Sequence, residues 1–253
     1  MKKQYLPLLT YLGIFLFLLC VGMLYQSRKT SDGVTSITAT EPESFSGDPE
    51  SSSNLSEALP RKKKIAITFD DGPHPVYTLK LLDGLAQRNV KATFFIIGES
   101  AERYPEVIKR IHDEGHLLGN HTYSHVQLTC ISSTRAIEEI HKTNDILSSI
   151  TGENVRYIRP PFGLYNKTLA ASSDLVPVLW TVDPRDWSVL NTNSVVSHVV
   201  KKVKENDVIL LHDIFDTSVD AALQIIDSLL EQGYTFVTVD ELMESNPKIA
   251  LYR

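Results

Sequence analysis

The sequence predicts an α/β fold in which a parallel sheet closes into a (β/α) barrel. Apolar runs of strand length alternate with helical periodicities over roughly 190 residues, which is typical of successive strand–helix units. Polar residues suited to catalysis directly follow several of the apolar runs. Because a (β/α) barrel collects its chemistry at the carboxyl ends of its strands, this placement favours a barrel over an open sheet.

The amino-terminal segment is predicted to lie outside that fold. Met1 is followed by Lys2 and Lys3, and residues 6–25 are uncharged and rich in Leu, Phe and Ile. Twenty residues at helical rise cover roughly 30 Å, which is enough to span a bilayer. No small-residue cleavage site of a signal peptide follows the apolar run. Residues 1–29 are therefore expected to form an uncleaved transmembrane signal anchor.

Composition separates a linker from a folded domain. Residues 30–63 are predicted to be a flexible linker, because most of this stretch is Ser, Thr, Glu, Asp and Gly with few large apolar residues. The folded domain is expected over residues 64–253. A net charge of -6 suits a soluble ectodomain and gives no general attraction to nucleic acid. Cys20 and Cys130 are the only cysteines and lie in different segments, so no disulfide framework is expected.

Within the domain, the elements are predicted in chain order from their periodicity. The strands are residues 65–69, 92–97, 117–119, 176–179, 208–211 and 235–239. Apolar stripes at helical spacing mark the helices, namely Leu79, Leu82 and Leu85, then Val107, Ile108 and Ile111, then Ile137, Ile140, Leu147 and Ile150, then Val195, Val196, Val199, Val200 and Val203, and finally Ala222, Ile225, Ile226 and Leu229.

Two adjacent carboxylates, Asp70 and Asp71, end the first strand. Like charges this close raise each other's pKa, so a cation or a basic partner is expected beside them. His121 and His125 are four residues apart, a spacing that on a helical turn brings both imidazoles within reach of one ion. Asp71, His121 and His125 are therefore predicted to bind a metal with an open position for water, as in catalytic zinc sites. Non-haem iron uses the same ligand types, so these residues alone leave the metal open.

Asp70 is then the free carboxylate, placed to take a proton from water. Arg159 needs an anion, so we pair it with Asp70, which it would keep ionised and oriented as a general base. Arg159 begins a stiff segment in which two prolines lack N–H groups. The first N–H groups after them belong to Phe162 and Gly163, and either is a candidate oxyanion donor. A plain proline corner fits the segment equally well.

His212 follows the apolar strand 208–211. Burial alone would lower its pKa and keep the ring neutral. A partner carboxylate such as Asp186 would oppose that effect and keep His212 cationic, able to protonate a leaving amine. Trp180 and Leu210 are candidate walls of a small apolar pocket, although core packing is their default role.

Five segments in this order resemble the motifs of the NodB-homology polysaccharide deacetylases, the family 4 carbohydrate esterases. They are Thr-Phe-Asp-Asp-Gly-Pro at 68–73, His-Thr-Tyr-Ser-His at 121–125, Arg-Pro-Pro-Phe at 159–162, Asp-Pro-Arg-Asp-Trp at 183–187 and Leu-Leu-His-Asp at 210–213. The resemblance covers about residues 64–242. It implies a distorted (β/α) barrel and metal-dependent removal of N-acetyl, sometimes O-acetyl, groups from sugar polymers.

The resemblance also implies a role for each site residue. Asp70 would be the base and His212 the acid, with Arg159 orienting Asp70 and Asp186 tuning His212. Asp71, His121 and His125 would hold a divalent metal, with zinc expected and cobalt or another divalent ion as the alternative. Phe162, where many members have Tyr, would donate its backbone N–H to the oxyanion. Trp180 and Leu210 would hold the acetyl methyl group.

The Gly72-Pro73 ending is similar to the peptidoglycan N-acetylglucosamine and chitooligosaccharide branches of the family. With an anchor and a linker, the expected substrate is N-acetylglucosamine of peptidoglycan, and the expected location is the cell membrane, with a monomeric domain facing the wall. A chitooligosaccharide N-deacetylase and an O-acetyl xylan esterase are the alternative enzymes; an iron oxygenase leaves Arg159 and His212 unexplained. A metal-dependent glycan-binding module is the alternative outside enzymes, against which intact Asp70 and His212 weigh.

Overall fold

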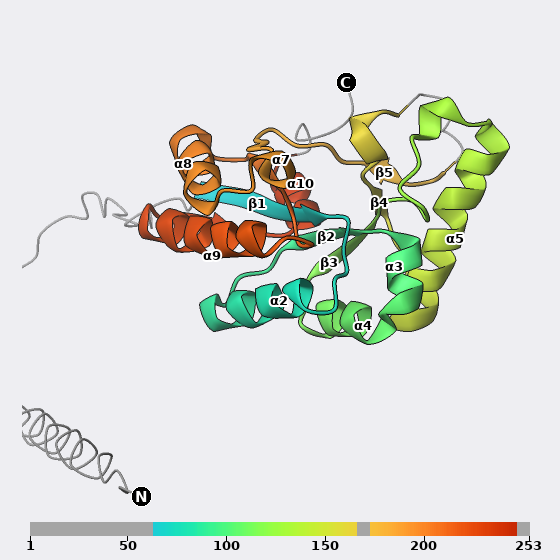
Figure 1. Ribbon diagram of the computed structural model, residues 1–253, viewed down its shortest axis with the longest axis horizontal. Helices are drawn as coiled ribbons and strands as arrows, with labels where there is room; N and C mark the ends of the chain where they lie inside the picture. The colour runs from blue at the N-terminus through green and yellow to red at the C-terminus, as the bar shows by residue number, and fades with distance from the viewer. Residues whose placement is uncertain (1–62, 166–172, 247–253) are drawn as a thin grey trace, which may run out of the picture. The chain divides into compact units, whose positions relative to one another are not determined.

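The computed structural model describes residues 63–165 and 173–246. The predicted anchor, and the predicted linker up to residue 62, lie outside these residues. Within the described ranges, no helix combines the length and the apolar character needed to cross a membrane. The described residues form a sheet surrounded by helices (Figure 1).

Within residues 63–165 and 173–246, seven strands form one parallel sheet in the order β5-β4-β3-β2-β1-β6, and β7 pairs with the start of β1. In the register, Asp70 of β1 lies opposite Phe95 of β2 and His212 of β6. The carboxyl ends of these strands are therefore level, as a shared site at one end of the sheet requires. The strands are β1 (Lys63–Asp70), β2 (Thr93–Ile96), β3 (Leu117–Asn120), β4 (Tyr157–Ile158), β5 (Val176–Pro177), β6 (Val208–His212) and β7 (Tyr234–Phe236).

The sheet curls, and one stretch of chain joins its two sides. At one end of this stretch, the Val178 N–H donates to the Ile158 carbonyl of β4 at 2.8 Å. At the other end, Val182 pairs with β6, where the Leu210 N–H donates to the Val182 carbonyl at 3.0 Å. Residues 176–182 therefore bridge β4 and β6 around a common interior. The predicted parallel α/β arrangement is confirmed, with this irregular bridge in place of a full closing strand.

Alternation along β1 separates an outer face from an inner face. The odd-numbered residues from Ile65 to Phe69 pack in the main apolar core, together with residues of the surrounding helices. Ala66 packs instead in a second cluster with Val208 and with Leu242 of the last helix. Because side chains of a strand alternate between its faces, Thr68 and Asp70 share the inner side with Ala66. The inner side thus changes from apolar to polar towards the carboxyl end of β1.

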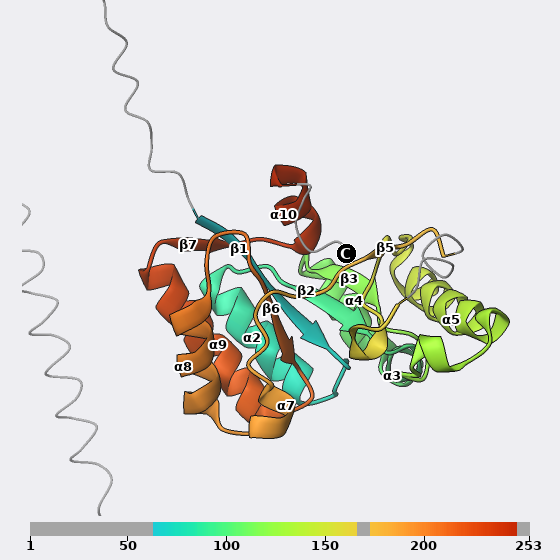
Figure 2. The ribbon, with the colours of Figure 1, turned by 90° about the horizontal axis from the view of Figure 1, so that it is seen from above.

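Helices cover the outside of the sheet, and α2, α8 and α9 lie side by side along β1 and β6 (Figure 2). The α-helices of the described residues are α2 (Tyr77–Arg88), α3 (Gly98–Arg103), α4 (Pro105–Asp113), α5 (Ser133–Thr151), α7 (Asp186–Val189), α8 (Thr192–Lys202), α9 (Asp216–Glu231) and α10 (Val239–Ser245). The five predicted apolar stripes correspond to α2, α4, α5, α8 and α9.

The prediction of a strand over residues 235–239 is wrong at its carboxyl end. Thr238 and Glu241 form a capping box, in which the Glu241 carboxylate accepts the Thr238 N–H at 3.0 Å. The strand consequently stops at Phe236, and Val239 begins α10. The prediction of strand 176–179 is also too long, since regular pairing covers only Val176–Pro177.

Candidate active site

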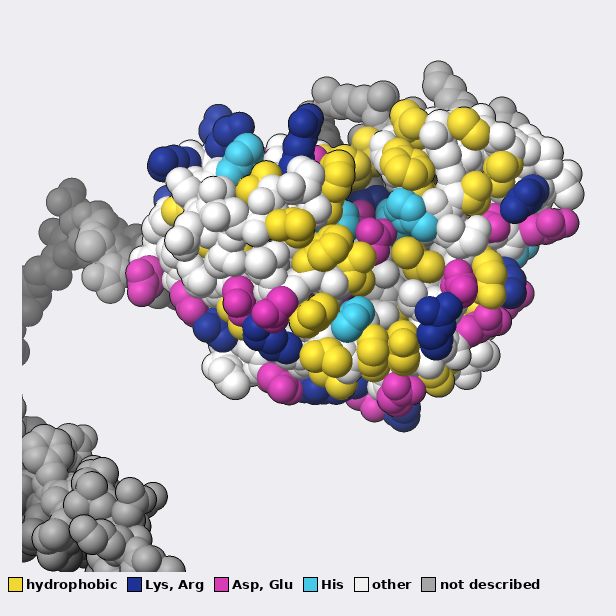
Figure 3. All heavy atoms as spheres, viewed as in Figure 1, with side chains coloured by type: hydrophobic (Ala, Val, Ile, Leu, Met, Phe, Trp, Pro, Cys, Tyr) yellow, Lys and Arg dark blue, Asp and Glu magenta, His cyan; other side chains and the backbone are white. Residues whose placement is uncertain are grey.

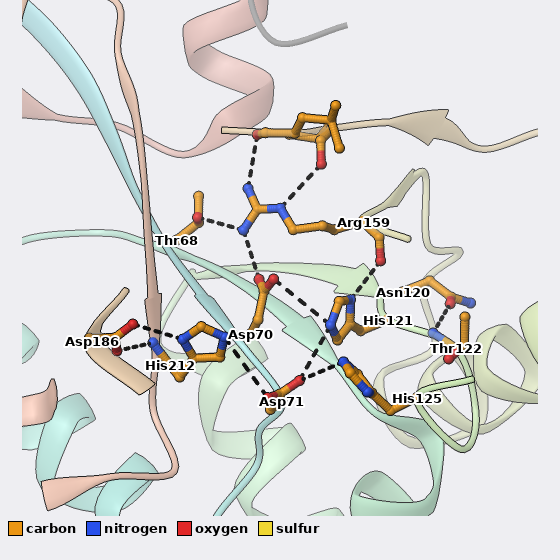
Figure 4. Close-up of polar contacts among 12 residues, drawn as sticks. Thr68, Asp70, Asp71, Asn120, His121, Thr122, His125, Arg159, Asp186 and His212 are labelled. Atoms are coloured by element: carbon orange, nitrogen blue, oxygen red, sulfur yellow. Dashed lines mark hydrogen bonds and ion pairs between the residues drawn. The ribbon is translucent and has the colours of Figure 1, made fainter. Parts of the chain in front are cut away.

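Three side chains that can bind a metal meet at the carboxyl ends of β1 and β3 (Figure 4). Nε2 of His121 and Nε2 of His125 each lie 3.3 Å from Oδ1 of Asp71. One ligand atom from each residue lies within 4.8 Å of the other two. The structure therefore brings together the three residues that spacing and residue type had predicted.

The predicted helical turn between His121 and His125 is wrong, because these residues lie in a loop. Thr122 (φ 65°) and His125 (φ 53°) both adopt left-handed backbone, which places the second imidazole beside the first. Asn120 holds the loop: its side-chain oxygen accepts the Thr122 N–H at 2.7 Å, and its amide donates to the Ile140 carbonyl at 2.8 Å. Left-handed non-glycine residues store strain that the surrounding structure must offset, and Asn120 contributes to that.

The local chemistry fits a divalent cation. Nδ1 of His121 donates to the Arg159 carbonyl at 2.6 Å, which leaves Nε2 facing Asp71. Oδ1 of Asp71 is buried and makes no hydrogen bond to any described residue. Burial opposes ionisation of Asp71, but His121, with smaller effects of His212 and His125, lowers its pKa. Burial also lowers the pKa of His125. An ionised carboxylate and a neutral imidazole are the forms that bind metals, and several divalent ions accept this donor set.

Arg159 is fully buried inside the curled sheet and binds Asp70. Its Nη1 donates to Oδ1 of Asp70 and to Oγ1 of Thr68, both at 2.7 Å. The remaining donors go to backbone carbonyls, from Nε to Val178 and from Nη2 to Leu179, both at 3.1 Å. The predicted pairing of Arg159 with Asp70 is present. Since Oδ1 is occupied, Oδ2 is the oxygen of Asp70 left for chemistry.

The guanidinium of Arg159 also lies over the ring of Phe95, with 4.1 Å between its central carbon and the ring centroid. Neither Phe95 nor Thr68 was predicted to act in the site. Thr68 could have been found from the sequence, because strand alternation puts it on the same side as Asp70. Phe95 carried no such indication, since its default role is core packing.

His212 is held by Asp186 from two directions. Nδ1 of His212 lies 2.9 Å from Oδ1 of Asp186, and the His212 backbone N–H donates to Oδ2 at 2.9 Å. Burial of the ring disfavours its charged form, but the hydrogen bond and the charge of Asp186, with smaller contributions from Asp70 and Asp71, raise the pKa of His212 to about 9. Nε2 lies 3.9 Å from Oδ2 of Asp71. His212 is thus a cationic donor at neutral pH beside the metal-binding residues.

A cavity of about 460 Å³ opens over these groups. Figure 3 shows it as a hollow with histidine and acidic side chains inside. Trp180 and Leu210, the predicted pocket walls, both line it, whereas Trp187 and Phe215 were not predicted to do so. The lining residues are Asp70, Asp71, His121, His125, Pro160, Phe162, Trp180, Asp183, Trp187, Leu210, His212 and Phe215.

Phe162 lies at this cavity with left-handed backbone (φ 61°, ψ 9°) in the short 3-10 turn η2 (Pro161–Gly163). Its ring packs edge-on against His125, with 5.1 Å between the ring centroids. Among the described residues, none accepts a hydrogen bond from its backbone N–H. That donor is therefore available to a ligand, and its predicted oxyanion role stays a prediction.

Residues 58–177 match the family model for polysaccharide deacetylase. The chain is 40% identical over 192 residues to a peptidoglycan-N-acetylglucosamine deacetylase of Bacillus cereus, in an alignment that covers 73% of this chain and 70% of that protein. The chain belongs to the polysaccharide deacetylase family. The resemblance inferred from the five motifs is confirmed, and with it the predicted enzyme class, a hydrolase acting on amide bonds.

Other polysaccharide deacetylases of known sequence or structure agree with this assignment. The chain is 42% identical over 185 residues to the peptidoglycan-N-acetylmuramic acid deacetylase PdaC of Bacillus subtilis, covering 73% of this chain but 40% of that protein. A solved structure of PdaC matches with a TM-score of 0.73 at 41% identity, covering 75% of this chain and 94% of the solved one. The chain thus spans less than half the length of some relatives that it matches.

Replacing Asp186 with Asn is expected to shift the alkaline limb of deacetylation to lower pH. In the parent, His212 keeps its proton up to about pH 9. A neutral amide has no charge to offset burial, so the pKa of His212 should fall from about 9, with only Asp70 and Asp71 left to oppose the effect of burial. The raised pKa also contributes stability that is full below pH 6.5 and is lost as the pH rises through about 9.

The profile of kcat/KM against pH measures the first effect of the Asp186 change, because it reports pKa values of the free enzyme. Urea unfolding at pH 6 and pH 8 measures the second. A matched control is Asp227→Asn, which removes a carboxylate paired with Arg88 on the outer surface. An alkaline limb that coincides in the Asp186→Asn variant and in the parent would contradict the predicted role of His212 as the acid.

Proposed function

We propose that this deacetylase hydrolyses the N-acetyl groups of N-acetylglucosamine in cell-wall peptidoglycan. The observation that carries the proposal is a carboxylate and an imidazole, of Asp70 and His212, that face one cavity from the paired strands β1 and β6, beside a three-residue metal-binding set. Asp70 is fixed by Arg159 on one side, and His212 is fixed by Asp186 on the other. Amide hydrolysis needs both proton transfers, one from water and one to the leaving nitrogen.

A divalent ion bound by Asp71, His121 and His125 would acidify water and polarise the acetamide carbonyl. Oδ2 of Asp70 would accept the proton of the attacking water, because the hydrogen bond from Arg159 leaves that oxygen free. Zinc is the expected ion, with cobalt or another divalent ion as the alternative.

The remaining residues would act on the substrate itself. The Phe162 N–H would donate to the oxygen of the tetrahedral intermediate, a contact worth about 3 kcal/mol. His212 would give its Nε2 proton to the departing glucosamine nitrogen, and acetate would be released. Trp180 and Leu210, which line the cavity, would pack against the acetyl methyl group.

The choice of sugar rests on the Gly72-Pro73 ending and on the Bacillus cereus relative, which is named for N-acetylglucosamine. The Bacillus subtilis relative is named for N-acetylmuramic acid, so the two sugars must be distinguished by experiment. We further propose that residues 1–29 anchor the protein in the cell membrane, and that a monomeric domain faces the wall outside.

The test is acetate release by the purified full chain from peptidoglycan fragments, N-acetylglucosamine oligomers and O-acetylated xylan. Mass spectrometry of the fragments then assigns each lost acetyl group to one sugar. Loss from N-acetylglucosamine supports the proposal. Loss confined to muramic acid or to xylan overturns it, and glycan binding without any release would favour a binding module.

Metal removal is expected to abolish acetate release, and added zinc or cobalt is expected to restore it. Substituting one predicted ligand, in His125→Ala, should lower both metal content and activity by at least about a hundredfold, since even groups behind the ligands typically contribute 10–100-fold. His141→Ala, on the exposed face of α5, is the control. Full activity after chelation, with no metal in the protein, would contradict the metal site.

A further inference from the structure

A second, larger cavity adjoins the active-site cavity. It has a volume of about 880 Å³ and is lined by the loop 181–185, by one face of α8 and by residues just beyond α8. Asp183 lines both cavities, so the two are neighbours. In Figure 3, Lys and Arg side chains gather above and to the left of the hollow, on the face that also holds the active site. We call this second cavity the basic groove.

Cations dominate the basic groove. Arg185, Lys201, Lys202 and Lys204 line it together with His198, against only two carboxylates. Both carboxylates already accept backbone N–H groups, Asp183 from Arg185 at 2.7 Å and Asp207 from Lys204 at 2.6 Å. The groove is therefore a concentration of positive charge in a chain whose net charge is -6.

In the described part of the chain, none of these four cations forms an ion pair with a carboxylate. Several cations elsewhere on the surface are paired: Lys80 with Asp216 at 2.7 Å, Arg88 with Asp227 at 2.6 Å and Arg110 with Asp83 at 2.7 Å. Lysines in the last turn of a helix interact favourably with the helix dipole. This interaction explains the positions of Lys201 and Lys202 at the end of α8, but of no other cation in the groove. It does not account for Arg185, which reaches the same groove from another segment with left-handed backbone (φ 55°).

We propose that the basic groove binds carboxylates on the units of the polysaccharide that flank the sugar being deacetylated. This inference rests on the proposed function, because peptidoglycan carries carboxylates on its lactyl-linked peptides. A polymer that places one acetamide in the active-site cavity continues past Asp183 into the groove. The negative net charge of the chain repels an anionic polymer. A local positive site would attract the polymer and fix which of its sugars lies in the active-site cavity.

The test removes three charges in the full chain, as Lys201→Gln, Lys202→Gln and Lys204→Gln together. A matched control removes three charges outside both cavities, as Lys109→Gln, Arg135→Gln and Arg156→Gln. KM and kcat are measured on a peptidoglycan fragment with free peptide carboxylates and on a neutral N-acetylglucosamine oligomer. Exposed ion pairs contribute modestly, so KM for the carboxylated fragment should rise about tenfold with kcat retained.

The neutral oligomer should show no change in KM, and the control variant should match the parent on both substrates. Salt should raise the KM of the parent for the carboxylated fragment only. An unchanged KM for the carboxylated fragment in the triple Lys→Gln variant, or an equal rise on both substrates, overturns the proposal. Poly(glycerol phosphate), added as a competitor, distinguishes phosphate from carboxylate as the anion that binds. If the groove binds this polymer and does not bind the carboxylated fragment, the carboxylate assignment is wrong.

Calorimetric titration with the carboxylated fragment measures binding without turnover. It separates failure of this inference from failure of the proposed function. If neither substrate releases acetate, the proposed function fails, yet a Kd about tenfold weaker in the triple Lys→Gln variant still supports the groove.

Discussion

Asp70→Asn is expected to lower acetate release by about 10³–10⁴-fold while metal content stays at the parental level. The amide keeps an oxygen that can accept from Arg159, but it cannot take a proton from water. General bases contribute typically about 10²–10⁴-fold, and the fixed geometry of this carboxylate places it at the upper end. Single-turnover acetate release and metal analysis on the same preparation measure the two quantities.

The control for Asp70→Asn is Asp145→Asn, on the outer helix α5. Because Arg159 loses its counter-charge in the Asp70 variant, unfolding in urea must show that the protein is folded at the assay temperature. A folded Asp70→Asn protein with activity close to that of the parent would exclude Asp70 as the base.

Arg159→Met is expected to lower the free energy of unfolding by about 3–5 kcal/mol and to abolish activity. The substitution leaves Asp70 as a buried carboxylate without its cation, which is the costly way to break a buried ion pair. It also removes the donors to the Val178 and Leu179 carbonyls. Urea unfolding measures the loss.

The double variant Asp70→Asn, Arg159→Met is the informative control. It removes both charges, so it should be more stable than Arg159→Met alone, and the double-mutant cycle should give a coupling energy of about 1–3 kcal/mol. Arg159→Lys keeps the charge but loses the planar fork, and should be intermediate in stability. Additive effects of the two single substitutions would show that the pair does not act as a unit.

The two acid–base pairs of this site were predicted by matching each charged residue with a residue of opposite charge, although the sequence gives no distances between them. Arg159 and Asp70 lie far apart in sequence, and each needed an opposite charge. His212 and Asp186 were matched by the same reasoning. Apolar residues alternate over residues 65–69, a run long enough for a period of two to be recognised. This pattern predicted a strand, with the two carboxylates at its end.

The features that could not be predicted from the sequence lie in short strands or irregular loops. Strand β4 has only two residues, too few for any period to appear. The positive φ angles at Thr122 and His125 occur in residues that usually avoid them, so the histidine spacing suggested a helical turn instead of a loop. The basic groove was also missed, because Arg185 and Lys204 come together only through the packing of the loop beside α8.

The bridge formed by residues 176–182 connects two parts of the candidate site. Its first part carries the carbonyls that hold Arg159, and its last part pairs with the strand that ends in His212. Because the pairing of β1 with β6 already holds Asp70 level with His212, the irregular stretch, fastened at its ends, sets instead where Arg159 lies against Asp70. Trp180 lies in the same stretch and lines the cavity, so changing the stretch beyond Leu179 is a route to altering which acylated sugars fit while the contacts of Arg159 are kept.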